Sequence, residues 1–228
     1  MYPRSTIAFA AMLLTGAAAH ADQRDFPVGA FDRLASSGSG DISVTTGKSP
    51  SVRVEASKET LDRMDIRVEG GTLKIGMKKS WGVSWSSGKI RISVTTGMLR
   101  SADMSGSGSI SIDRVKVPEF SLSMSGSGDA KLPSLDADLV KMSIAGSGDI
   151  NAAGRCGEAR VDIAGSGDID IGALKCTKLS GSIAGSGDIT AFATTTANVS
   201  IAGSGDAVIR GGAKCTSSRA GSGTVTCG

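Results

Sequence analysis

Aromatic and imidazole side chains are scarce in this sequence, and their scarcity excludes several kinds of chemistry. Aromatic residues make up 4% of the chain, which has a single histidine, His20, and a single tyrosine, Tyr2. Both precede the point at which we expect an export signal to be removed. The mature chain then has no imidazole for acid–base catalysis, for a Ser-His pair or for metal binding. Most hydrolase and zinc mechanisms are thereby excluded, and the sequence predicts no metal site and no cofactor.

Long hydrophobic runs are also lacking. The N-terminal apolar run, Ile7 to Leu14, is well short of the roughly 20 residues that a spanning helix needs. It follows the basic Arg4 and precedes Ala-His-Ala (19–21), the small-x-small pattern of signal cleavage. We therefore predict that residues 1–21 are a cleaved signal peptide. Residues 22–228 would form a single exported domain, periplasmic or extracellular, with no transmembrane segment.

Glycine, in contrast, is abundant, with 32 residues in the chain, and much of it recurs as Gly-Ser-Gly triplets spaced 18 to 20 residues apart. The first glycines of the regular triplets are Gly106, Gly126, Gly146, Gly165, Gly185, Gly203 and Gly221, and an earlier copy begins at Gly38. Apolar and polar residues alternate around each triplet, which is the period of a β-strand. A fixed period with one turn per repeat is typical of a solenoid.

We therefore predict an all-β, single-stranded parallel β-helix with coils of about 18–20 residues. Residues 101–228 would form regular coils, each with a Gly-Ser-Gly corner that needs positive φ or a close backbone approach. Residues 22–100 would form wider, less regular coils that cap the stack. Within them, 57–64 predicts a short helical turn, and Gly70-Gly71 predicts a turn between two strands.

Several segments together resemble the GIN-domain family, described as putative autotransporter adhesin head domains. The matching segments are FDRL (31–34), SGSGDI (37–42), SKETLDRM (57–64), VEGGTLKI (68–75) and the serial GSGD corners. The resemblance implies a right-handed β-helix exported by bacteria, and it brings no catalytic residues. Because the sequence closes on TVTCG, without room for a translocator domain, we do not expect self-export across an outer membrane.

An aspartate follows most of the triplets and forms a column of like charges. The column consists of Asp129, Asp149, Asp168, Asp188 and Asp206, with Ser109 and Thr224 at its ends. One interpretation is a structural corner ladder, in which each carboxylate accepts backbone N–H groups two residues on. The other is a column of cation sites, but the spacing does not match calcium-binding β-rolls. We favour the structural interpretation.

The four cysteines are even in number, as expected for disulfides in an exported protein. Cys156 and Cys176 stand one coil apart at nearly the same phase, within disulfide reach. Cys215 and Cys227 bracket the last triplet. We predict two structural disulfides, Cys156–Cys176 and Cys215–Cys227.

Positive charge is concentrated in residues 48–100, which hold eleven Lys or Arg against five Asp or Glu. Both tryptophans lie in the same segment. The candidate binding residues there are Trp81, Trp85, Lys78, Lys79 and Lys89. They could hold an anionic glycan through charge and aromatic stacking. Alternatively, the tryptophans cover the open end of the β-helix and the lysines form a solvated face.

These features predict an exported, non-catalytic, adhesin-like module that binds a cell-surface polysaccharide or an envelope protein. A second binding surface could lie along the polar ladders of the solenoid. Export argues against nucleic acid as a partner. Two alternatives stay open: a polysaccharide lyase or hydrolase on a β-helix, and a purely structural solenoid that self-associates through its open ends.

Overall fold

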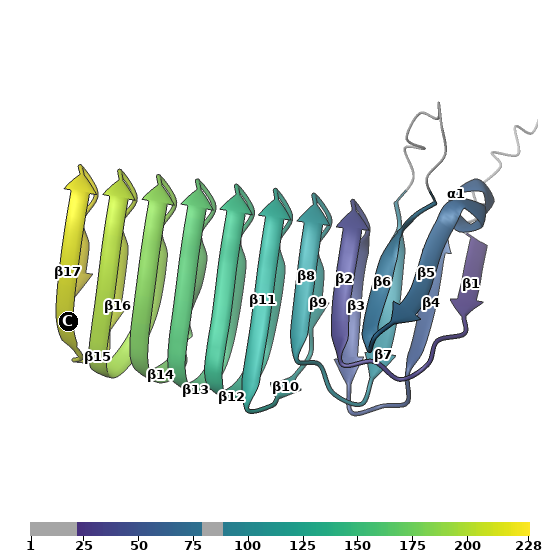
Figure 1. The fold of residues 1–228 in the computed structure, drawn as a ribbon, viewed down its shortest axis with the longest axis horizontal. Coiled ribbons are helices and arrows are strands. Elements are labelled where there is room, and N and C mark those ends of the chain that lie inside the picture. Colours follow the sequence, from purple (N-terminus) through teal and green to yellow (C-terminus); the bar gives the residue numbers. More distant parts are fainter. Residues whose placement is uncertain (1–21, 79–88) are drawn as a thin grey trace, which may run out of the picture.

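The chain forms a long stack of β-strand coils (Figure 1), described by a computed structural model over residues 22–78 and 89–228. Successive coils pair in parallel, and equivalent corner residues lie side by side. Gly126 pairs with Gly146, and Gly146 pairs with Gly165. The predicted parallel β-solenoid is confirmed.

The regular coils begin after residue 100 and continue to the C-terminal strand. Their strands are β8 (Ser101–Gly106), β9 (Ile110–Ile112), β10 (Val115–Lys116), β11 (Glu119–Gly126), β12 (Ala130–Gly146), β13 (Ile150–Gly165), β14 (Ile169–Gly185), β15 (Ile189–Gly203), β16 (Ala207–Arg210), β17 (Lys214–Gly221) and β18 (Val225–Cys227). Each corner separates two sides of the solenoid. The corner side contains β8, β11, β17 and the second halves of β12–β15, which run into the corners. The return side contains β9, β16, β18 and the first halves of β12–β15.

Aliphatic columns fill the interior, because inward positions repeat in register from coil to coil. One column begins at Met104 and ends at Ile201, and every member is at most 8% exposed. Its members are Met104, Met124, Ile144, Ile163, Ile183 and Ile201. Burial of apolar area contributes about 25 cal/mol per Å², and coil spacing of about 4.8 Å brings like residues into contact. The core can therefore form without many aromatic side chains.

The corners depend on two glycines in each triplet, for different reasons. Gly165 has a φ of +137°, and a Cβ there would overlap the carbonyl oxygen of Gly146 in the preceding coil. Gly167 lacks a positive φ in this range, but a Cβ there would overlap the carbonyl oxygen of Gly148. Both expected reasons for glycine, positive φ and close backbone approach, are confirmed.

The N-terminal part is built from seven strands and one short helix within the described residues. They are β1 (Asp22–Phe26), β2 (Arg33–Gly38), β3 (Asp41–Thr46), β4 (Ser51–Ala56), α1 (Lys58–Arg63), β5 (Met64–Glu69), β6 (Thr72–Met77) and β7 (Arg91–Thr96). The coil formed by β2 and β3 stacks directly on β8 and β9, while β6 and β7 stack on its other side. The order of coils in space therefore differs from their order in the sequence (Figure 1).

The N-terminal coils are less regular, as expected, but they include antiparallel strands that the repeat pattern did not predict. Strand β4 is antiparallel to β7, β1 is antiparallel to β4, and β5 is antiparallel to β6. The Gly70-Gly71 turn joins β5 to β6, as predicted. The predicted helical turn is α1, whose N-cap Ser57 accepts a hydrogen bond from the Thr60 amide at 3.3 Å.

Both predicted disulfides are confirmed by the geometry of the four cysteines. Cys156 and Cys176 are paired in register on β13 and β14, with a Cα–Cα distance of 4.5 Å. Cys215 on β17 and Cys227 on β18 have a Cα–Cα distance of 6.5 Å. The first disulfide joins adjacent coils, and the second joins the two sides of the last coil.

Candidate functional site

The aspartate column is a chain of hydrogen bonds between coils. The Asp149 carboxylate accepts the Asp168 amide at 3.0 Å, and the Asp168 carboxylate accepts the Asp188 amide at 2.8 Å. The same bond continues to Asp206 and then to Thr224. The predicted acceptor role is present, but the donor differs: it is the amide of the next coil, not one two residues on. In-register stacking places that amide within reach of the carboxylate.

Hydroxyl side chains replace aspartate at both ends of the column. Ser109 donates to the Asp41 carboxylate at 2.8 Å, and the Thr224 hydroxyl donates to Asp206 at 2.8 Å. Hydrogen bonds from Thr224 lower the pKa of Asp206. Over residues 22–78 and 89–228, no three His, Cys, Asp or Glu side chains gather in a way that could hold a metal ion. The column thus has a structural explanation in its own hydrogen bonds.

The predicted basic and aromatic residues lie around the connection from β6 to β7. Trp81, Trp85 and Lys79 fall outside the described residues. Lys78 donates from its ammonium group to the Asp62 carbonyl at 2.8 Å, which ties the end of β6 to α1. Lys89 is exposed just before β7.

A groove opens beside the strand that leads into this connection. It has a volume of about 580 Å³ and lies over β5, β6, β2, β8 and β11. The pairing of β6 with β2 stops at Ser36 and Ile75, so the last residues of β6 diverge from β2. We call this hollow the N-terminal groove. Its polar lining residues are Ser36, Ser37, Asp65, Arg67, Lys74, Asp103, Ser105, Ser123 and Ser125.

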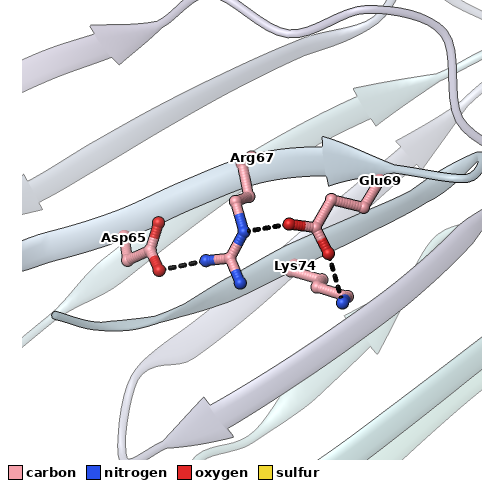
Figure 2. Close-up of polar contacts among 4 residues, drawn as sticks. All are labelled: Asp65, Arg67, Glu69 and Lys74. Atoms are coloured by element: carbon pink, nitrogen blue, oxygen red, sulfur yellow. Dashed lines mark hydrogen bonds and ion pairs between the residues drawn. The ribbon is translucent and has the colours of Figure 1, made fainter. Parts of the chain in front are cut away.

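The charged side chains on one wall of the N-terminal groove pair with one another (Figure 2). Arg67 contacts Asp65 and donates to Glu69 at 2.6 Å, and Lys74 contacts the other Glu69 oxygen. Hydrogen bonds from Lys74, and then from Arg67, lower the pKa of Glu69 to about 2. The β5–β6 hairpin aligns these side chains, because Arg67 pairs with Lys74 across it. The cations are therefore fixed in place and their charge is largely balanced.

The repeat pattern of the sequence does not predict this groove. Its walls come from segments far apart in the chain, and they meet because β2 is inserted between β6 and β8. One signal was available: the alternation of charge in DIRVEG and TLKI across the Gly70-Gly71 turn predicts cross-strand pairs. The serines that complete the groove carry no such signal.

These observations define the class of protein: a parallel β-solenoid cross-linked by two disulfides, with surface hollows of mixed lining and a charge network at its irregular end. The sequence matches the family described as "Putative auto-transporter adhesin, head GIN domain" over residues 30–213, and the chain belongs to that family. The family resemblance inferred from the sequence is confirmed.

Several solved bacterial structures have the same fold. A putative adhesin from Bacteroides fragilis has a TM-score of 0.85 at 24% identity, covering 90% of this chain and 96% of its own. A putative lipid binding protein from Parabacteroides distasonis has a TM-score of 0.76 at 27% identity, covering 92% and 97%. A putative adhesin from Parabacteroides merdae has a TM-score of 0.71 at 20% identity, covering 92% and 96%.

A comparison with curated proteins returned no match. In the described part of the chain, no helix has both the length and the apolar character required to cross a bilayer.

Proposed function

We propose that this protein is an exported, non-catalytic module that binds a surface glycan in the N-terminal groove. The groove carries the proposal, since a volume of about 580 Å³ falls in the range of small-molecule and oligosaccharide sites. The adhesin family and its solved relatives support a binding role. The two disulfides support export, because such bonds persist in oxidising compartments.

The lining of the groove favours a neutral, hydroxyl-rich ligand. Serine hydroxyls and carboxylates can both accept hydrogen bonds from sugar hydroxyls, and the serines can donate as well. Two acids, Asp65 and Asp103, and two bases, Arg67 and Lys74, line the groove, and Glu69 beside it pairs with both bases. This balance does not attract an anionic glycan by charge alone. The mutual pairing of the charged groups fixes their positions, which reduces the ordering cost of binding.

Glu69, the carboxylate beside the groove that bridges Arg67 and Lys74, is poorly suited to act as a general acid. A glycoside hydrolase needs a protonated carboxyl group as general acid, with a raised pKa. Glu69 has its pKa lowered to about 2, so it is ionised and engaged with Lys74 and Arg67. A lipid ligand is named in the description of the Parabacteroides distasonis protein. Here it would use the apolar part of the groove, Ala35, Ile75, Met77 and Met104, whereas the serines and charged side chains favour a sugar.

Glycan-array binding at two salt concentrations tests the proposal. We expect binding of neutral bacterial envelope glycans that changes little with salt, because the groove charges are balanced. Lys74→Ala/Asp103→Ala should weaken it about tenfold, equivalent to about 1.4 kcal/mol. Trp81→Ala/Trp85→Ala should weaken it further if the tryptophans stack on the sugar.

A matched double substitution on the regular coils serves as control. Lys178→Ala/Asp162→Ala removes the same two side-chain types from exposed positions of β13 and β14, and it should leave binding unchanged. Absence of glycan binding by the intact chain would contradict the proposal, as would equal losses in the groove variant and the control. Strong salt dependence would replace the neutral ligand with an anionic one.

A further inference from the structure

A second hollow lies on the return side of the solenoid, away from the N-terminal groove. It has a volume of about 450 Å³, and its polar lining comes from Asn151, Asp170, Thr190 and Arg210. A smaller hollow of about 360 Å³ continues it toward Lys131 and shares Asn151 and Asp170. Asp129, Asp149 and Asp168 of the aspartate column also line this smaller hollow. Together they form a groove across successive coils, which we call the return-side groove.

Irregular strand pairing hollows the surface at this place. On β14, residues 172–174 lie between the pairs Ile171–Ala191 and Lys175–Phe192, whose partners are consecutive on β15. The pairing of β14 with β13 also shifts at the same position. The extra residues of β14 form a wall beside the groove. Bulges of this kind are over-represented next to functional sites, where they redirect side chains.

Three polar side chains of the return-side groove are free to bind a ligand, whereas its aspartates also accept backbone amides. In the part of the chain that the structure describes, Asn151, Thr190 and Arg210 form no side-chain hydrogen bond or ion pair with another residue. One Asp170 carboxylate oxygen accepts the Gly172 amide at 3.0 Å, which holds the carboxylate in place and leaves its other oxygen available. This differs from the N-terminal groove, where the cations are already paired.

The spacing of these side chains fits an extended polymer. Lys131, Asn151, Asp170 and Thr190 are aligned in register on consecutive coils. Coils repeat at about 4.8 Å, close to the advance per residue of an extended β-linked sugar chain. A row that contains an ammonium group, an amide, a carboxylate and a hydroxyl offers both donors and acceptors, which matches sugar hydroxyls.

We propose that the return-side groove binds an extended, neutral, β-linked polysaccharide whose chain runs along the solenoid axis. Asp170 and Asn151 contact successive sugars at the centre, and Arg210 and Lys131 donate at the two ends. This site extends the proposed glycan binding to a second surface and does not depend on the N-terminal groove.

Fluorescence titration of the full chain with labelled cellohexaose tests this site, and labelled maltohexaose serves as an α-linked comparison. We expect saturable binding of cellohexaose that is at least tenfold tighter than binding of maltohexaose. Asn151→Ala/Thr190→Ala and Arg210→Ala should each weaken it about tenfold. Asp170→Asn, which keeps an acceptor for the Gly172 amide, should weaken it less than Asp170→Ala.

A control in the same coils separates this site from a general surface effect. Ser182→Ala/Ser200→Ala changes two residues of β14 and β15 on the corner side, and it should leave the titration unchanged. Wild-type affinity in the return-side variants would overturn the inference, as would failure of cellohexaose to bind. If the return-side variants bind cellohexaose normally and Lys74→Ala/Asp103→Ala does not, the return-side groove is not the binding site. The proposal for the N-terminal groove then stands.

Discussion

Replacing Gly165 by alanine is expected to destabilise the protein by roughly 3–5 kcal/mol, a large part of the stability of an ordinary domain. The residue has a φ of +137°, and its Cβ would overlap the Gly146 carbonyl oxygen. That oxygen accepts a hydrogen bond from the Ser166 amide at 2.9 Å, so the overlap cannot be relieved without separating the two coils. Urea unfolding followed by circular dichroism measures the loss.

Two further substitutions separate the causes of this loss. Gly212 has a φ of +75° with open space around its Cβ position, so Gly212→Ala should cost only about 1–2 kcal/mol. Gly167 has the steric overlap without the positive φ, so Gly167→Ala should fall between the other two. If Gly165→Ala unfolds at the same urea concentration as Gly212→Ala, the close approach of the Gly146 carbonyl oxygen adds nothing to the cost of the positive φ. The proposed role of backbone stacking at the corner would then be wrong.

Replacing Arg219 and Ser217 by isoleucine and valine is expected to convert the protein into a self-associating one. On the last coil, Ser217 and Arg219 stand opposite Val199 and Ile201, at the ends of two aliphatic columns. Both side chains are exposed. A further coil stacked on β17 would bury the guanidinium without a partner, which costs several kcal/mol. An inward-pointing charge on an edge strand is a known defence against edge-to-edge association.

This charge argues against self-association through the C-terminal end, one of the alternatives left open by the sequence. The family match stops at residue 213, so the last coil with its own disulfide lies beyond it. Sedimentation velocity over a hundredfold concentration range should show dimers or larger species for Arg219→Ile/Ser217→Val. Two variants should sediment as the wild type does: Arg219→Lys, which keeps the charge, and Arg160→Ile, a control on β13 away from the last coil. Concentration-dependent association of the wild type through β17 would contradict this explanation.

The regular coils could be predicted from the sequence because each of their determinants is local and repeated. The corners, the aliphatic columns and the first disulfide can each be read from residues that recur one coil apart. Cys156 and Cys176, for example, are paired in register on adjacent coils. The arrangement of the N-terminal strands could not be predicted in the same way. Their pairing joins β1 to β4 and inserts β2 between β6 and β8, and it depends on contacts between segments without a shared period.

The candidate sites were harder to predict for the same reason. The sequence predicted that the column carboxylates accept amides two residues on, whereas the donor lies in the next coil and is brought close only when the coils stack. The N-terminal groove requires the spatial order of β5, β6 and β2, and the return-side groove requires register shifts that a strict repeat does not contain. Binding surfaces in this solenoid arise where the repeat is interrupted.

The aspartate column is central to this account, because it links the regular coils and also borders the return-side groove. Adjacent carboxylates about 4.8 Å apart repel by roughly 1 kcal/mol in water, and the hydrogen bonds between coils offset this repulsion. Asparagine at Asp149, Asp168 and Asp188 would keep the acceptor oxygen and remove the charge. A scaffold role therefore predicts that this triple variant folds and melts at the wild-type temperature or above it.

The most direct measurement is the melting temperature of the wild type and the triple asparagine variant, each in EDTA and in millimolar Ca²⁺. With a scaffold role for the column, Ca²⁺ leaves both melting temperatures unchanged, because no site binds it in the folded state. A rise in the wild-type melting temperature with Ca²⁺ that disappears in the triple variant would contradict this. The column would then be a set of cation sites.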